Sequence, residues 1–250
     1  MKYMGSKSRI AKYIVPIIQK YIDDTNCRCY IEPFVGGANV IDKIRCDTKI
    51  GSDKNPYLIS LLQRVRDGGT LYDEVNKDLY DRAREAYHSG DKNSFQDWEL
   101  GNIGFLASYN GRWFDGGYAK PGYEKTSKGL HYRDYYREAM DNLLNQAGSL
   151  NGIQLYCRDY LFYNSQDLKD CVIYVDPPYC GQKKYANAAE FNYDEFWDTM
   201  RIWSKNNIVI VSELSAPADF ECIWEHIVTR TIKAKQKSKD TEKLFKYIHL

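Results

Sequence analysis

The sequence of 250 residues contains no long hydrophobic run. Its longest apolar stretches, residues 172–175 and 208–211, are about a fifth of the length that a membrane-spanning helix needs. The basic first ten residues are not followed by the apolar segment of a secretory signal. We therefore expect a cytoplasmic protein with no membrane partner.

Cysteine and histidine are present, but they lack the spacing of a metal site. The seven cysteines are odd in number and several lie in apolar stretches, so disulfides are not expected. Only Cys27 and Cys29 lie close together, and no second Cys or His pair accompanies them, which disfavours structural zinc. The four histidines are isolated from any catalytic partner. We predict no metal.

A large net charge is also lacking: the formal net charge at pH 7 is +1. The molecule as a whole therefore has no electrostatic attraction to a polyanion. Basic residues are instead clustered. Residues 109–137 hold six basic and three acidic side chains, and residues 230–246 hold seven and two. Aromatic residues interleave the first cluster, as is typical of surfaces that neutralise phosphates and contact bases. The second cluster fits a hairpin loop that touches phosphates, with a solvated turn as the alternative.

The chain does contain an alternation of short apolar stretches and helical patterns. Strands are expected near residues 29–31, 48–51, 154–157, 171–175, 207–211, 225–232 and 244–249. Helices are expected near residues 7–21, 38–45, 57–66 and 193–205. This alternation predicts βαβ units, and hence an α/β fold with a doubly wound, mostly parallel, Rossmann-like sheet.

Between residues 68 and 152 the strand pattern fades. Helical stretches near residues 71–88, 97–108 and 132–146 surround a segment rich in glycine, lysine and aromatic residues. We interpret this region as a mostly helical insertion into a core formed by residues 1–67 and 153–250.

The sharpest motif is Asp-Pro-Pro-Tyr at residues 176–179, directly after an apolar strand. Open α/β sheets bind ligands beyond the carboxyl ends of their strands, which is where this motif is expected. The prolines stiffen the backbone and leave carbonyl acceptors without N–H donors. A carboxylate and rigid carbonyls beside an aromatic ring suit an amino group on a flat heterocycle. A strand-ending proline turn is the alternative.

Two further strand ends support this interpretation. The segment 32–38, Glu-Pro-Phe-Val-Gly-Gly-Ala, follows the first expected strand, and its glycines allow a ligand to approach the backbone closely. Asp53 ends the second strand sixteen residues after Gly37. A spacing of roughly twenty residues is typical of an acidic side chain that binds a ribose hydroxyl.

The order of these motifs resembles the Dam-type, alpha-group DNA adenine-N6 methyltransferases over nearly the whole chain. Five matching segments have a role in the family: residues 3–7, the N-terminal cofactor motif; 32–38, the loop for the methionine end of S-adenosylmethionine; 53–56, the ribose turn; 157–160, which holds the cofactor's adenine; and 176–179, the catalytic tetrad. The stretch from residues 204–205 through 212–213 and 216–217 to 242–245 is also similar to the family's C-terminal part. The insertion matches only loosely and corresponds to the target-recognition region.

This resemblance implies methyl transfer from S-adenosylmethionine to an adenine that is flipped out of double-stranded DNA. Asp176 and the Pro177 carbonyl would accept the two amino hydrogens, and Tyr179 would stack on the base. The cofactor residues that it implies are Tyr3, Met4, Lys7, Glu32, Pro33, Phe34, Gly36, Gly37, Asp53, Asn55, Asp159, Tyr160 and Asp176. The DNA contacts that we expect are Arg112, Trp113, Lys120, Tyr123, Lys128, Lys235 and Lys237. We expect a monomer.

Two other functions remain open from the sequence. One is a methyltransferase for RNA or for a protein amide, since a related Asn-Pro-Pro-Tyr tetrad serves glutamine methylation. Asp176 and the basic, aromatic insertion favour DNA over these substrates. The other is a catalytically idle DNA-binding module, which intact Asp176, Tyr179 and Lys7 disfavour.

Overall fold

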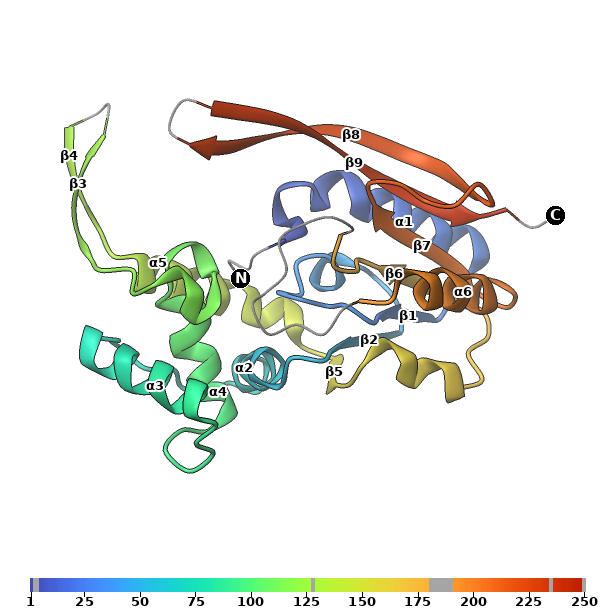
Figure 1. The fold of residues 1–250 in the computed structure, drawn as a ribbon. Helices are drawn as coiled ribbons and strands as arrows, with labels where there is room; N and C mark the ends of the chain where they lie inside the picture. The colour runs from blue at the N-terminus through green and yellow to red at the C-terminus, as the bar shows by residue number, and fades with distance from the viewer. Residues whose placement is uncertain (2–4, 127–128, 180–190, 234–235, 249–250) are drawn as a thin grey trace. The chain divides into compact units, whose positions relative to one another are not determined.

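The computed structural model describes residues 1, 5–126, 129–179, 191–233 and 236–248, and of residues 126, 228–233 and 236–240 it describes the backbone alone (Figure 1). The chain divides into two compact units. The first comprises residues 1–15, 35–44 and 51–158, and the second comprises residues 16–34, 45–50 and 159–250.

A seven-stranded sheet has the strand order β5-β2-β1-β6-β7-β9-β8. Its strands are β1 (Cys29–Glu32), β2 (Thr48–Asp53), β5 (Ile153–Cys157), β6 (Cys171–Val175), β7 (Ile208–Glu213), β8 (Phe220–Lys233) and β9 (Gln236–Tyr247). β6 pairs in parallel with both β1 and β7, whereas β9 runs antiparallel to β7 and β8. The predicted α/β fold with a mostly parallel sheet is confirmed.

Six α-helices lie within the described residues: α1 (Ala11–Thr25), α2 (Pro56–Arg66), α3 (Lys77–Ser89), α4 (Asp97–Gly101), α5 (Tyr135–Leu150) and α6 (Tyr193–Ser204). α2 begins where the Asn55 side chain accepts hydrogen bonds from the Tyr57 and Leu58 amides, with Pro56 in its first turn. Pro16 lies inside α1. α1 starts and ends four residues later than the helix expected at residues 7–21.

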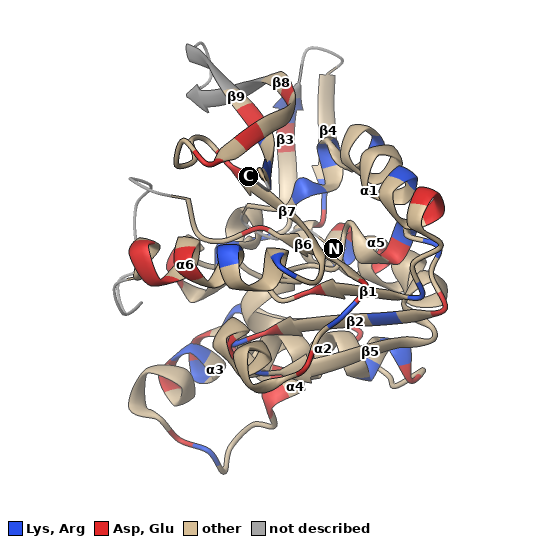
Figure 2. Cartoon of the chain, turned by 90° about the vertical axis from the view of Figure 1, so that its right-hand side faces the viewer, with Lys and Arg blue, Asp and Glu red and all other residues tan. Residues whose placement is uncertain are grey.

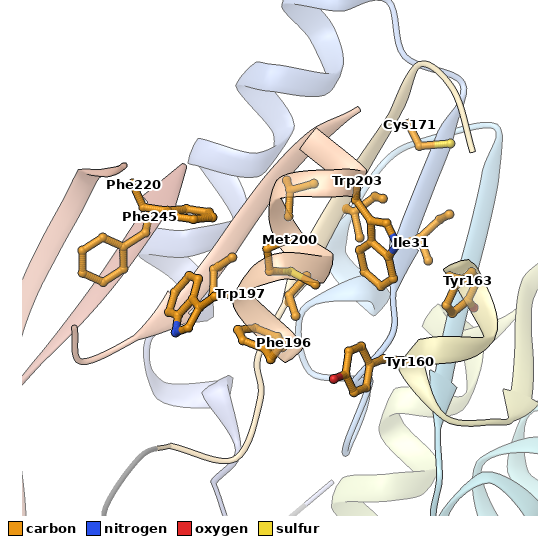
Figure 3. Close-up of a cluster of buried hydrophobic side chains, with 14 residues drawn as sticks. Ile31, Tyr160, Tyr163, Cys171, Phe196, Trp197, Met200, Trp203, Phe220 and Phe245 are labelled. Atoms are coloured by element: carbon orange, nitrogen blue, oxygen red, sulfur yellow. The ribbon is translucent and has the colours of Figure 1, made fainter. Parts of the chain in front are cut away.

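In the second unit, one face of the sheet carries a cluster of buried apolar side chains (Figure 3). α6 contributes Phe196, Met200 and Trp203, and alternate residues of β6 such as Ile173 face the same cluster because side chains alternate across a strand. The first turn of α6 is acidic, as its colour in Figure 2 shows, which suits the positive end of the helix dipole.

In the first unit, two glycines allow close packing. A Cβ atom added at Gly101 in α4 would lie 2.3 Å from the Tyr57 carbonyl oxygen of α2. A Cβ atom at Gly104 would lie 2.6 Å from the Trp113 ring. Trp113 in turn stacks on Tyr57 with ring centroids 5.2 Å apart. Any larger side chain at either glycine would push these elements apart.

Some expected elements are wrong. No α-helix covers residues 38–45: Ala38 has a positive φ of 55°, and only a short 3-10 turn, Ile41–Lys43, follows. The Asn39 side chain is instead bonded to Ser6 Oγ at 2.9 Å. Tertiary hydrogen bonds thus replace the helix that the local composition favours.

The insertion is less helical than predicted. The helix expected at residues 71–88 begins only at Lys77, and the one at 97–108 changes to a π-helix at Asn102–Leu106. An antiparallel hairpin, β3 (Gly122–Thr126) with β4 (Gly129–Arg133), was not expected. In β3 and β4 the side chains are mostly exposed on both faces, so the hydrophobic alternation that marks a strand is missing.

Phe196 provides a test of the cluster on α6, because its side chain is fully buried. We expect Phe196→Ala to lower the free energy of unfolding by about 3–5 kcal/mol, measured by chemical denaturation. Ile202→Ala on the same helix is the control, since Ile202 is 57% exposed and its truncation should cost little. Equal losses in the two variants would contradict this packing.

Candidate functional site

The glycine loop after β1 is held by backbone contacts within the first unit. The Val35 amide donates to the Ser52 carbonyl at 2.8 Å, and the Gly36 amide donates to Asp53 Oδ2 at 3.3 Å. Gly36 has a φ of 49°, a region that glycine enters without strain. The loop is therefore tied directly to the end of β2.

The space beside this loop is tight. A Cβ atom at Gly51 in β2 would lie 2.8 Å from Val35 Cγ2 and 3.2 Å from Leu155 Cδ2. Gly51 thus permits the loop to pack on β2, which the sequence did not indicate.

Asp53 lies at the end of β2, as predicted. Its Oδ1 accepts a hydrogen bond from the Asn55 amide at 3.0 Å, and its backbone carbonyl accepts one from the Arg158 amide at 3.0 Å. Its side chain is half-buried. Asn55 caps α2, so both polar residues predicted for a ribose are fixed by local geometry.

A residue that the sequence did not indicate, Gln146 of α5, also holds the glycine loop. Its Nε2 donates to the Gly37 carbonyl at 3.1 Å and to the Ala38 carbonyl at 2.9 Å. Lys7 lies buried in a 3-10 turn, Lys7–Arg9, of the same unit. A glutamine buried on a helix is a signal of polar contact, but its partner cannot be read from spacing.

In the second unit, β1 ends at a buried carboxylate. Glu32 Oε1 accepts a hydrogen bond of 2.6 Å from the Tyr30 hydroxyl. Burial and the neighbouring Glu32 raise the pKa of Tyr30 well above its ordinary value. The phenol therefore stays protonated and remains a donor to Glu32.

Aromatic rings follow this carboxylate. Phe34, which comes after the buried Pro33, lies 5.1 Å from the Tyr160 ring, centroid to centroid, with 30° between the planes. Burial raises the pKa of Tyr160 to about 12. The exposed Asp159 accepts a hydrogen bond from the Leu161 amide at 3.0 Å and starts the 3-10 helix Tyr160–Ser165. The structure thus brings two predicted aromatic residues together.

The Asp-Pro-Pro-Tyr segment follows β6 directly. Asp176 is half-buried, Pro177 is buried and Pro178 is exposed. The Pro178 carbonyl accepts a hydrogen bond from the Tyr193 hydroxyl at 2.8 Å. The turn is therefore fixed by its own prolines and by the start of α6.

The hydroxyl of Tyr179 makes hydrogen bonds to two neighbouring strands. Its oxygen lies 2.8 Å from Ser212 Oγ on β7 and 2.7 Å from Glu242 Oε2 on β9. Burial, Asp176 and Glu242 together raise the pKa of Tyr179 well above its ordinary value. Neither Ser212 nor Glu242 was given a role from the sequence.

The residues expected to contact DNA differ in exposure. Arg112, Lys120 and Tyr123 are exposed, and Tyr123 is 70% exposed on β3. Trp113 is buried among aromatic rings, and its ring lies 4.4 Å from that of Phe105. Its structural role is packing, and a DNA contact by Trp113 stays a prediction.

Several predicted positions lie outside the described residues, namely Tyr3, Met4, Lys128 and Lys235, and of Lys237 only the backbone is described. Among described residues, no three His, Cys, Asp or Glu side chains gather closely enough to hold a metal ion. No helix in the described part of the chain has the length and apolar character needed to cross a membrane.

Comparison with known proteins identifies relatives of this chain. The M.MjaIII type II methyltransferase of Methanocaldococcus jannaschii is 24% identical over 230 residues, which are 81% of this chain and 76% of that protein. The DNA adenine methylase of Salmonella typhimurium is 28% identical over 176 residues, which are 67% of this chain and 62% of that protein.

Among solved structures, the rRNA methyltransferase aviRa of Streptomyces viridochromogenes aligns with a TM-score of 0.39 at 10% identity, covering 96% of this chain and 84% of that one. This likeness is too weak to add to the comparison of sequences. The family model of the D12 class N6 adenine-specific DNA methyltransferases, in contrast, matches residues 3–212. This match includes the glycine loop, Asp53 and the Asp-Pro-Pro-Tyr segment, and it covers most of the chain. The chain therefore belongs to the D12 class N6 adenine-specific DNA methyltransferase family and is an enzyme that methylates adenine in DNA.

Proposed function

We propose that this chain transfers the methyl group of S-adenosylmethionine to N6 of an adenine flipped out of double-stranded DNA. The observation that carries the proposal is the rigid turn at the carboxyl end of β6, where Asp176, the buried Pro177 and the anchored Tyr179 follow one another. These residues offer two acceptors and an aromatic face, which suit the amino group and the ring of adenine. RNA and protein amides become the less favoured substrates, because the family match is to DNA enzymes.

Each unit, taken by itself, holds residues that suit one part of S-adenosylmethionine. In the first unit, Gly36 and Gly37 leave the loop backbone open to close approach, and Asp53 is a half-buried carboxylate suited to ribose hydroxyls. In the second unit, Tyr160 offers a ring suited to an adenine, and Phe34, whose ring lies 5.1 Å from it, belongs to the loop assigned to the methionine end. Lys7, Glu32, Pro33, Asn55, Asp159 and the undescribed Tyr3 and Met4 complete the residues that we assign to the cofactor. When bound, the cofactor supplies an electrophilic methyl group.

Asp176 has the central role toward the base. The lone pair of the adenine amine is conjugated with its ring and is a poor nucleophile. Hydrogen bonds from the amine to the Asp176 carboxylate and to the Pro177 carbonyl would pull it toward tetrahedral geometry and hold it in line for attack. Stacking on Tyr179 would retain the flipped base, whose extrusion costs a few kcal/mol.

Residues 1–67 and 153–250 form the catalytic core that we propose, and the insertion, residues 68–152, is our candidate for DNA recognition. The β3–β4 hairpin of the insertion exposes Tyr123, Leu130 and Tyr132. The rings of Tyr123 and Tyr132 meet edge to face, with centroids 5.3 Å apart. Exposed aromatic residues of this kind suit contact with bases or sugars. The exposed Arg112 suits a base edge, and the exposed Lys120 suits a phosphate. Lys128, Lys235 and Lys237 remain proposed DNA contacts from the sequence alone.

We further propose that the enzyme is a cytoplasmic monomer, since one chain carries all the residues assigned to cofactor, base and DNA. The overall test is methylation-aware sequencing of plasmid DNA from cells that express it. N6-methyladenine at a defined sequence is the expected result. Its absence, with active protein confirmed by cofactor binding, would contradict DNA methylation.

Asp176→Ala tests the chemistry of the turn. Methyl transfer should fall by orders of magnitude because an acceptor for the amino group is lost, while S-adenosylmethionine affinity should change far less. Activity is measured as transfer of a tritiated methyl group to DNA, and affinity by calorimetry. Asp167→Ala is the control, since Asp167 forms an exposed pair with Lys169. Near-native activity of Asp176→Ala would refute its assigned role.

Asp53→Ala tests the ribose assignment. Loss of a charge-assisted hydrogen bond, together with the Gly36 contact, should weaken cofactor binding about ten- to a hundredfold. Calorimetry on the folded variant measures the change, and Asp73→Ala, at an exposed position of the same unit, is the matched control. Unchanged affinity in Asp53→Ala would place the ribose elsewhere.

Tyr123→Ala tests the hairpin. Removal of an exposed ring that contacts bases should weaken DNA binding by about 1–3 kcal/mol while leaving stability and cofactor affinity unchanged. Binding is followed by fluorescence anisotropy with a labelled duplex that carries the methylated sequence. Leu144→Ala, an exposed apolar position on α5, should bind like the unchanged protein. If both variants bind alike, the hairpin is not part of the interface.

A further inference from the structure

The face of the sheet opposite the aromatic cluster carries a row of polar side chains. Tyr174 alternates with Ile173 and Val175 of the cluster, so it points to this opposite face. In the antiparallel register Ser212 pairs with Leu244, and Glu242 lies two residues before Leu244. Ser212 and Glu242 therefore share this face, and both are almost fully buried, at 1% and 4% exposure.

The hydrogen bonds that join Tyr179 to Ser212 and Glu242 have a defined direction. A phenol has one hydrogen and a carboxylate only accepts, so Tyr179 donates to Glu242 at 2.7 Å. Ser212 then donates to the Tyr179 oxygen at 2.8 Å. The raised pKa of Tyr179 keeps its hydroxyl protonated, which preserves this arrangement.

We propose that Glu242 and Ser212 are positioning residues that hold the Tyr179 ring by its hydroxyl and so present its face to the target base. The inference rests on the function proposed above. Since the hydroxyl is used inside the protein, the ring face is the part of Tyr179 assigned to the substrate. The two bonds to one oxygen, from residues of two different strands, restrict rotation of the ring before the base arrives.

The chemistry of Glu242 supports a role beyond folding. A carboxylate that is 4% exposed has lost most of its hydration, and well-packed apolar residues often serve stability equally well. Glu242 bonds to Tyr179, the last residue of the tetrad, so we attribute the desolvation cost of burying this carboxylate to function rather than to stability. Glu242 also lies beyond residue 212, where the family match ends.

The test compares Tyr179→Phe, Glu242→Ala and Glu242→Gln in steady-state transfer of a tritiated methyl group to plasmid DNA that lacks N6-methyladenine. Tyr179→Phe and Glu242→Ala should each lower kcat about tenfold or more, because a hydrogen bond to a charged group is lost. KM for S-adenosylmethionine should stay within about twofold, as expected when an interaction made only in the transition state is lost. Partial unfolding would also lower apparent kcat at constant KM, so kcat is normalised to the concentration of cofactor-binding enzyme measured by calorimetry. Glu242→Gln retains an acceptor and should recover part of the rate.

A double-mutant cycle decides whether Glu242 acts through Tyr179. Tyr179→Phe combined with Glu242→Ala should be no slower than Tyr179→Phe alone, because the hydroxyl is already gone. Multiplied losses in the double variant, or unchanged kcat in Glu242→Ala, would overturn the proposal. If Glu242→Ala shows no cooperative thermal unfolding, Ser212→Ala and Glu242→Gln decide: a lowered kcat supports the proposal and an unchanged kcat in both overturns it.

Glu225→Gln is the matched control, since Glu225 is an exposed carboxylate on the neighbouring strand β8. It should keep the full rate. Absence of DNA methylation by the unaltered chain would refute the proposed function itself. Normal methylation by that chain and by Glu242→Ala would refute only the positioning role.

Discussion

The parallel register that places β6 between β1 and β7 is the constraint on which the second unit depends. Side chains alternate along each strand, so pairing Tyr30 with Val172, and Tyr174 with Ile210, commits every following residue to one face or the other. One face receives the apolar residues that pack against α6, and the other receives hydroxyls and carboxylates beside apolar residues such as Val172 and Ile210. A shift of one residue in β6 would exchange these faces, placing Tyr174 in the apolar cluster and Ile173 on the opposite buried face beside the polar groups.

The same register explains why polar groups are buried so close to the turn after β6. Tyr30 and Glu32 satisfy each other, and Tyr179 is satisfied from β7 and β9. Each of these contacts joins groups that would be costly to bury alone. The antiparallel return of β9 is essential to this arrangement, because it brings a residue from near the end of the chain beside the tetrad.

The sequence predicted the strands of the sheet and the order of the motifs because both depend on local pattern. Five apolar residues before Asp176 and a glycine loop after β1 are visible without coordinates. It did not predict that Asn39 and Gln146 would form tertiary hydrogen bonds around the loop, so residues 38–45 were wrongly expected to be helical. The role of Glu242 was hidden for a similar reason, since a lone acidic residue in a strand does not reveal which distant hydroxyl it meets. The exposed β3–β4 hairpin lacked the alternation from which strands are recognised.

Gln146 connects two parts of the first unit that sequence separates by more than a hundred residues. Gln146 belongs to α5, which begins at Tyr135, two residues after the end of β4 in the exposed hairpin. Its side-chain amide donates hydrogen bonds to the carbonyls of Gly37 and Ala38. A ligand that displaced α5 would therefore strain the glycine loop, and a ligand that stiffened the loop would restrain α5. By thermodynamic reciprocity, any such coupling makes the two binding events strengthen or weaken each other by the same factor.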